Sequence, residues 1–279
     1  MARSRVGKYG VLNVVSQPHP AGAYKQLFND AAEKSIVVSV RSDRFARLGS
    51  VTQSRNYVFS GVIAFWTEVD PNGKAIRKSD LQQSALADLG VSLPEGIGFN
   101  SRIFAYSFNE KTHKLFVQTK NDYGDVVSIH SLRVAFEALL REALPREWDS
   151  VNVHLETASD ALERVISLPV ITKIRVVVYR PNPDNIDELV ERKVRELEQG
   201  NISRLKTIAN KAKGASTLKL VGDLRAAAEL ARDNGIVEVS GKEDGRRVTR
   251  STDEYPLEIS EKLEADQTSA VVTRRLAEG

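Results

Sequence analysis

Histidines offer the broadest chemistry of any side chain in this sequence, and there are only four of them. No two stand three or four residues apart, so no helical histidine pair can hold a zinc ion, while a cluster formed by the fold stays open. We expect each to be a surface residue or a hydrogen-bonded core residue. The chain has no cysteine, which excludes disulfides, thiolate metal sites and cysteine nucleophiles. The histidines are His19, His113, His130 and His154.

Sequence fingerprints of catalysis are missing from the chain. It has no Walker-type phosphate loop, no dinucleotide-binding glycine motif and no Gly-x-Ser-x-Gly elbow. Gly90, Gly96 and Gly98 lie near one another, but their spacing and the intervening Pro94 fit a surface loop. The sequence therefore predicts a protein that is not an enzyme and that has no cofactor and no metal site.

One pattern is typical of metal-dependent nucleases and has to be weighed against this prediction. Pro183-Asp184 is followed by Glu191-Arg192-Lys193, an order in which carboxylates could hold Mg²⁺ and a lysine could assist the attacking water. However, Glu191 and Lys193 fall inside an expected amphipathic helix, where two residues lie roughly 200° apart around the axis. We therefore favour a solvated helix surface and keep a metal-dependent nuclease as an alternative.

Three basic clusters are the best candidates for a binding function. The first surrounds Asp43, which could instead pair with one of its arginines. The second lies in a stretch without acidic residues from 201 to 222, expected to be a helix over 202–213. The third lies on one arm of an expected hairpin, where Arg246 and Arg250 share a face and Arg247 takes the other. We predict phosphate contacts from all three clusters: Arg41, Arg44, Arg47, Arg204, Lys206, Lys211, Lys213, Arg246, Arg247 and Arg250.

The distribution of charge supports a basic surface more than the net charge does. The net charge is only +3, with a pI near 9.0. Residues 1–55 hold nine Lys or Arg against three Asp or Glu, and residues 173–213 hold ten against six. Folding could bring these two segments into one positive face, which would attract phosphate by releasing counterions. An ordinary solvated surface is the alternative interpretation.

Hydrophobic periodicity predicts an α+β fold with antiparallel or mixed sheets, packed helices and two domains. In the first half, alternating residues indicate strands at 11–15, within 35–70 and in a hairpin over 100–120, and helical spacing indicates helices at 23–34 and 128–143. In the second half we expect strands at 151–155, 171–179, 236–241, 246–252 and 270–274, and helices at 157–168, 185–198, 202–213 and 222–234. Because Pro145 ends a helix, we place the boundary there, giving residues 1–147 and 148–279.

Targeting segments are not evident in the sequence. The basic start is not followed by an apolar core, and no apolar run approaches the length of a membrane span. With the absence of cysteine, this favours a cytoplasmic protein that does not insert into membranes.

Seven stretches carry a resemblance to known proteins: His19-Pro20, Ala23-Tyr24, Leu27-Phe28, Val40–Gly49, Ser60–Asp70, His113–Val117 and Asp233–Gly235 with the hairpin that follows. They resemble a family of uncharacterised prokaryotic proteins found in phage-defence settings. The overall layout also resembles the A component of the lambdoid Rex phage-exclusion system. That resemblance implies a two-domain homodimer that binds double-stranded DNA with little sequence preference and signals to a downstream effector protein.

Our functional hypothesis is a non-enzymatic DNA-binding protein of antiviral defence. It rests on the basic clusters for the ligand and on the resemblance for the setting. The alternatives are a protein-interaction or regulatory subunit of a defence or toxin system, and the nuclease described above. No helix carries a base-reading signature, so contact with the nucleic-acid backbone is the mode we expect.

Overall fold

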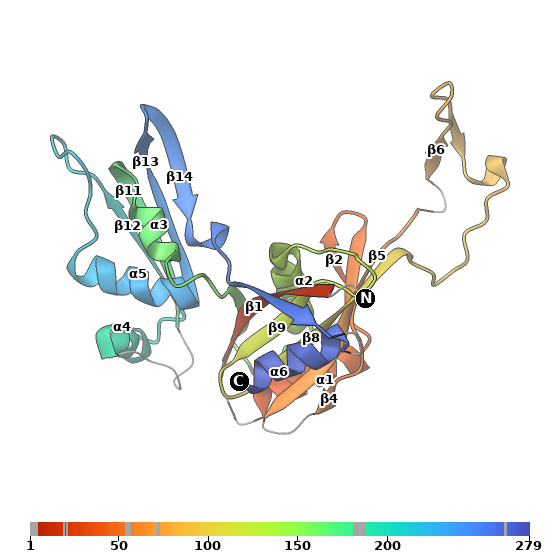
Figure 1. Ribbon diagram of the computed structural model, residues 1–279, viewed down its shortest axis with the longest axis horizontal. Helices are drawn as coiled ribbons and strands as arrows, with labels where there is room; N and C mark the ends of the chain where they lie inside the picture. The colour runs from red at the N-terminus through yellow and green to blue at the C-terminus, as the bar shows by residue number, and fades with distance from the viewer. Residues whose placement is uncertain are drawn as a thin grey trace.

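The computed structural model describes residues 5–18, 20, 22–53, 57–70, 73–180, 188–264 and 267–279. Within these residues it contains six α-helices and fifteen strands, which confirms the expected α+β fold. Every named strand pairing is antiparallel. Figure 1 shows two bodies joined by a narrow connection, with a long arm projecting from the larger one.

The larger body is built on a nine-stranded sheet with the main order β10-β1-β9-β8-β5-β3-β2. Its longest strand, β1, is flanked by β9 on one side and by both β10 and β15 on the other. β4 adds to β5. The strands are β1 (Arg5–Gln17), β2 (Val38–Arg41), β3 (Arg44–Leu48), β4 (Thr52–Gln53), β5 (Val58–Thr67), β8 (Phe99–Asn109), β9 (Lys114–Lys120), β10 (Ser150–Leu155) and β15 (Glu258–Leu263).

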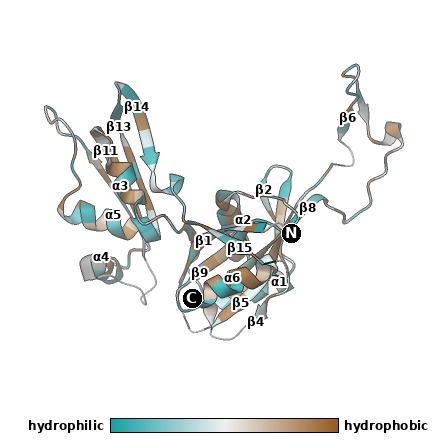
Figure 2. Ribbon diagram, in the orientation of Figure 1, coloured by the Kyte–Doolittle hydropathy of each residue, from teal (hydrophilic) through white to brown (hydrophobic). Residues whose placement is uncertain are grey.

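Helices cover both faces of this sheet, but they do so unequally. On one face α1 (Ala23–Glu33) and α2 (Ile129–Glu142) enclose the main core, whose apolar residues are brown in Figure 2. Phe28 lies at its centre, with the rings of Phe59 and Phe108 at 5.0 and 5.3 Å. On the other face α6 (Ser269–Glu278) packs across β8, β9 and β5. This helix leaves the outer face of β3 and the end of β5 uncovered.

The smaller body is a four-stranded sheet with helices on one face. Its order is β12-β11-β13-β14, and its core joins alternate residues of β11 and β13 to the three helices. The strands are β11 (Val170–Tyr179), β12 (Arg204–Asn210), β13 (Gly235–Glu243) and β14 (Arg246–Ser251), and the helices are α3 (Ala161–Ile166), α4 (Glu188–Gln199) and α5 (Gly222–Asn234).

The smaller body is inserted between two strands of the larger sheet. β10 ends with Leu155 opposite Leu12, and β15 begins with Glu258 opposite Gly10. The chain therefore leaves and rejoins β1 two residues apart. The expected division at residue 147 differs from this arrangement, because β10, β15 and α6 pair or pack with the larger sheet although they follow residue 147.

Two predicted elements of the second half are wrong. The segment 202–213 contains strand β12, because Leu205, Thr207 and Ala209 alternate toward the helices and the backbone pairs with β11 along its whole length. The segment 270–274 lies in helix α6, because Val272 and Thr273 are buried together with Ala277 at helical spacing. No strand was predicted for residues 258–263, which form β15 and pair with β1.

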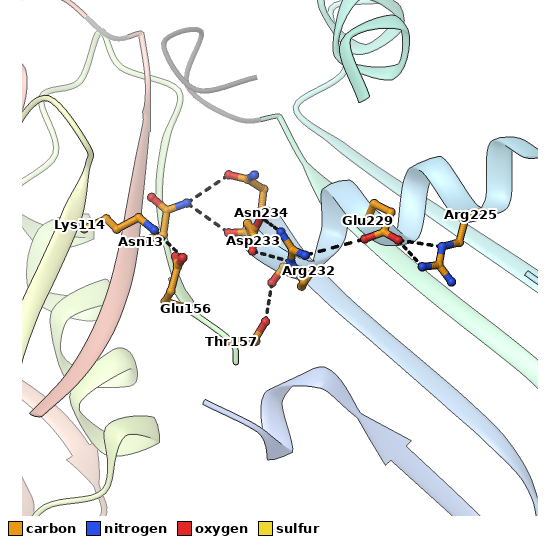
Figure 3. Close-up of polar contacts among 9 residues, drawn as sticks. All are labelled: Asn13, Lys114, Glu156, Thr157, Arg225, Glu229, Arg232, Asp233 and Asn234. Carbon is orange, nitrogen blue, oxygen red and sulfur yellow. Dashed lines mark hydrogen bonds and ion pairs between the residues drawn. The ribbon is translucent and has the colours of Figure 1, made fainter. Parts of the chain in front are cut away.

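Polar contacts hold the two bodies together at the connection (Figure 3). Asn13 of β1 donates to the carbonyl of Asp233 and to the Asn234 side chain, at 3.2 and 3.1 Å. Thr157 donates to the carbonyl of Arg232 at 3.2 Å. These acceptors are at the C-terminal end of α5, where helix carbonyls lack partners within the helix. The junction thus uses the end of α5 as an anchor on the larger sheet.

The membrane prediction is consistent with the helices. No helix in the described part of the chain is long and apolar enough to span a bilayer.

The packing of α6 can be tested with two adjacent valines. Val272 is 1% exposed against the sheet, whereas Val271 is 55% exposed. We expect Val272→Asp to lower the free energy of unfolding by about 3 kcal/mol or more, because it replaces a buried apolar group with an unpaired carboxylate. Val271→Asp should change it by less than about 0.5 kcal/mol. Urea denaturation measures both, and equal losses would contradict this placement of α6.

Candidate nucleic-acid interface

The face of the four-stranded sheet that carries no helix is the candidate site, called here the open sheet face. Side chains alternate between the two faces of a strand, and directly paired residues share a face. Ile174, Val176 and Val178 of β11 are buried beneath the helices. The intervening residues therefore project from the open face, together with their partners on β12, β13 and β14. Within the described part of the chain, the larger body meets this face at one end, where Tyr179 and Ile236 line a small cavity together with α2 and β10, and the rest of the face carries no helix layer.

Most long side chains on the open sheet face are cationic. Lys206 of β12 pairs with Val177, and Arg204 pairs with Tyr179 at the end of the same two strands. On β11, Lys173 and Arg175 share this face by alternation. On the far edge, Lys242 lies opposite Arg247. The six cations of the open face are Lys173, Arg175, Arg204, Lys206, Lys242 and Arg247.

Charge compensation on this face is sparse. Arg175 forms an ion pair with Glu238 at 2.8 Å, the single ion pair that the described residues make with any of these six cations. Lys242 and Arg247 lie directly opposite each other, an arrangement that destabilises a sheet when nothing neutralises it. Both are exposed. An unneutralised set of like charges on a flat sheet is what a polyanionic ligand would stabilise.

An aromatic ring lies at the end of the face nearest the larger body. The guanidinium of Arg204 stands over the Tyr179 ring, 5.5 Å from its centroid. The ring of His154 of β10 also lies against it, at 4.6 Å between centroids. Tyr179 thus joins the basic face to the connection between the bodies.

A small cavity of about 100 Å³ lies at this junction, between α2, β10, β11 and β13. Its lining includes Arg133, Glu137, Tyr179 and Asp253, and His154 closes it. Burial, together with the nearby charges of Arg133 and Arg141, lowers the pKa of His154 to about 3. This histidine is therefore neutral at physiological pH and acts as a packed ring, not as an acid or base.

The predicted second cluster lies only partly on the face. Arg204 and Lys206 belong to the open face, as just described. Lys213 is exposed in the segment that follows β12. Lys211 donates to the carbonyls of Ala212 and Ala215, so its ammonium is directed toward its own loop. The cluster was predicted on a helix, and the structure instead places it along the edge of a sheet.

The third cluster is divided between the two faces, as its alternation predicted. Arg247 lies on the open face, and Arg246 and Arg250 lie on the helix side. Arg250 makes two hydrogen bonds to Glu243 at 2.7 and 2.8 Å and a third to Ser167. The pair with Glu243 joins the two strands of the hairpin, while the bonds to Ser167 and to the carbonyl of Arg164 attach the hairpin to the end of α3. Arg250 is therefore a structural residue in this arrangement.

The first cluster lies on the larger sheet, away from the open face. Arg41 and Arg44 face each other at the β2–β3 turn, the edge opposite β10. Arg47 donates to the Ser35 side chain at 2.7 Å. Asp43 forms no ion pair with these arginines among the described residues. The structure does not bring Arg41, Arg44 and Arg47 together with the other two clusters.

Three of the six cations of the open face, and its aromatic residue, were not predicted from the sequence: Lys173, Arg175, Lys242 and Tyr179. The alternation of Lys173 and Arg175 between buried residues of β11 is a signal that could have identified two of them. Lys242 was assigned to a turn, whereas it is the last residue but one of β13.

The nuclease-like pattern takes the helical form that the sequence predicted. Glu191 and Lys193 lie on α4, where Glu191 pairs with Arg195 and Lys193 with Glu196. Pro183 and Asp184 lie outside the described residues, as does His19. Within the described residues, no group of three or more His, Asp or Glu side chains is arranged to hold a metal ion.

The buried histidine predicts a pH dependence of stability. Because the pKa of His154 is lower in the folded protein than the usual value near 6.5, only the unfolded chain takes up this proton as the pH falls from about 6.5 toward 3. Stability should therefore decrease over this window. His154→Phe should reduce the slope by up to about 1.4 kcal/mol per pH unit in urea denaturation. Exposed His130→Gln is the control, and a slope unchanged by His154→Phe would contradict this burial.

Comparison with known proteins gives the chain a family but no activity. No curated protein matches it. A family model described as a domain of unknown function, DUF4747, matches residues 6–278 and so spans both bodies and the arm. Because the match covers nearly the whole chain, this protein belongs to the DUF4747 family of domains of unknown function.

Proposed function

We propose that the protein is a non-enzymatic DNA-binding protein that contacts double-stranded DNA through the open sheet face. The observation that carries the proposal is the set of six cations on that face, for which Glu238 is the single acidic partner among the residues that the structure describes. Positive side chains on a flat surface bind phosphate by Coulomb attraction and counterion release.

The spacing of the cations suits a duplex. Neighbouring strands lie about 4.8 Å apart, so β12 and β14 at the two edges are separated by roughly 14 Å. Lys206 and Arg247 are also offset by six residues, roughly 20 Å, along the strands, so they lie at diagonally opposite corners of the face. Cations spread over this distance can contact several phosphates along a duplex. Long flexible side chains in this arrangement read the backbone and carry little base specificity.

The proposed setting is cytoplasmic antiviral defence. It rests on the resemblance to the Rex phage-exclusion protein and on the cysteine-free sequence, which suits a reducing compartment. In this setting DNA binding would trigger a downstream effector protein. A protein-interaction function is the second candidate, favoured by the exposed apolar arm of the larger body.

Charge reversals at the two edges of the open sheet face test the proposed DNA-binding site. We expect Arg247→Glu to weaken binding to random double-stranded DNA by about tenfold or more at low salt. It should also reduce the slope of log K against log salt concentration by about one, because one phosphate contact is lost. Lys206→Glu on the other edge should act in the same way. Fluorescence anisotropy from low to physiological salt measures both effects.

The matched control is Arg246→Glu, which makes the same change in charge on the opposite face of the same strand. We expect it to keep more of the wild-type affinity than Arg247→Glu, and Arg44→Glu on the larger sheet should behave similarly. Equal losses from Arg246→Glu and Arg247→Glu would contradict a face-specific site. DNA cleaved in the presence of Mg²⁺ would support the nuclease alternative instead.

A further inference from the structure

The arm, defined as residues 73–98, connects β5 to β8 and extends away from the larger body (Figure 1). It contains two three-residue strands, β6 (Lys74–Ile76) and β7 (Gln83–Ala85), and the short 3-10 helix η1 (Ala87–Leu89). None of its described side chains is buried. A two-stranded hairpin of this kind is only marginally stable by itself. Long excursions from a compact body are commonly functional.

Apolar side chains are exposed along the whole arm. Leu81, at the turn of the hairpin, is 71% exposed. Its backbone is left-handed, with φ at 58°, a conformation that favours glycine or asparagine and is unfavourable for leucine. The structure thus holds a large apolar side chain out at the tip of the arm at a conformational cost. The other exposed apolar residues of the arm are Ile76, Leu89, Val91 and Ile97.

The charges of the arm argue against nucleic acid as its partner. Lys74, Arg77 and Lys78 are balanced by Asp80, Asp88 and Glu95 within the described arm, and Arg77 pairs with Asp80 at 3.1 Å. A segment without net charge has no Coulomb attraction to the phosphates of a nucleic acid. Its exposed surface suits the apolar surface of a protein.

An open apolar groove of about 970 Å³ lies at the base of the arm. One wall is the uncovered outer face of β5, with Val62, Ala64 and Trp66. The opposite wall is the returning end of the arm, including Leu93 and Ile97. Gly98 permits this close approach, since a Cβ added there would lie 2.1 Å from Trp66 Cδ1. The groove is therefore built into the fold of the larger body.

The two features are complementary but are not joined within one chain. Leu81 and Leu89, toward the tip of the arm, do not line the groove, whereas residues 93–99 at its base do. The molecule therefore carries both an apolar projection and an apolar groove without a partner. A second copy of the chain provides a groove for the arm and an arm for the groove. A two-fold axis between the copies makes both arm–groove contacts at once.

We propose that the protein forms a dimer in which the arm of each copy lies in the groove of the other. The size of the arm supports this: a stable interface uses about 20–30 residues from each partner, and the arm alone supplies that many. The exchange would bury the exposed leucines and cover the end of β5. This proposal does not depend on DNA binding by the open sheet face.

The absence of cysteine allows a direct crosslinking test. Two single-cysteine proteins of different mass are mixed and oxidised, one with Val62→Cys in the groove and the other with Leu81→Cys, Leu89→Cys or Val91→Cys in the arm. We expect a covalent heterodimer with at least one arm position on a non-reducing gel. In the control mixture, a protein with Val271→Cys, exposed on α6, is used in place of the arm variant. We expect no covalent heterodimer from it.

Sedimentation equilibrium gives the second measurement. The wild type should be a dimer at micromolar concentrations, and Leu81→Asp combined with Leu89→Asp should weaken dimerisation at least tenfold, while Val271→Asp leaves it intact. A monomeric wild type would overturn the proposal. The proposal would also be overturned if a chain carrying both the groove cysteine and an arm cysteine formed the crosslink within a monomer. Arm variants that remain dimeric but lose DNA binding would overturn it as well.

Discussion

The architecture depends on the backbone pairing of β1. One edge of this strand is shared end to end by β10 and β15, and β9 occupies the other edge. Because the smaller body is inserted between β10 and β15, both of its connections are fixed to β1 two residues apart. The contacts of Asn13 with the end of α5 add a third attachment. The smaller body is therefore held at one end, with its open sheet face free of the larger body over most of its length.

One-sided coverage by helices explains the chemistry of the open face. α3, α4 and α5 all pack on the same side of the four-stranded sheet, so its apolar residues are used there and the alternate positions are left for solvent. These positions carry six cations and Tyr179. Among the described helices, α6 alone covers the second face of the larger sheet, and it leaves the groove beside Trp66. Both proposed surfaces are therefore consequences of where helices are absent.

Local periodicity was sufficient to predict much of the fold and failed where pairing decided the structure. Ile171–Tyr179 and Ser128–Ala143 were predicted correctly, because each has one strong pattern. Residues 202–213 fit both a helix and a strand, and pairing with β11 decided between them. The insertion could not be predicted, since the return of residues 258–263 to β1 is a contact between distant segments. For the same reason, Arg204 and Lys206 were predicted in one basic cluster and Arg247 in another, but the two clusters were not predicted to meet on one sheet face.

Chemical footprinting of lysines tests the central claim most directly, because it reports every lysine of the intact protein in one experiment. Acetylation followed by mass spectrometry would be compared with and without double-stranded DNA at low salt. The account predicts that DNA protects Lys173, Lys206 and Lys242 on the open sheet face, while the reactivity of Lys74 and Lys78 on the arm is the same with and without DNA. Protection of the arm or of the larger sheet, with these three lysines unchanged, would contradict it.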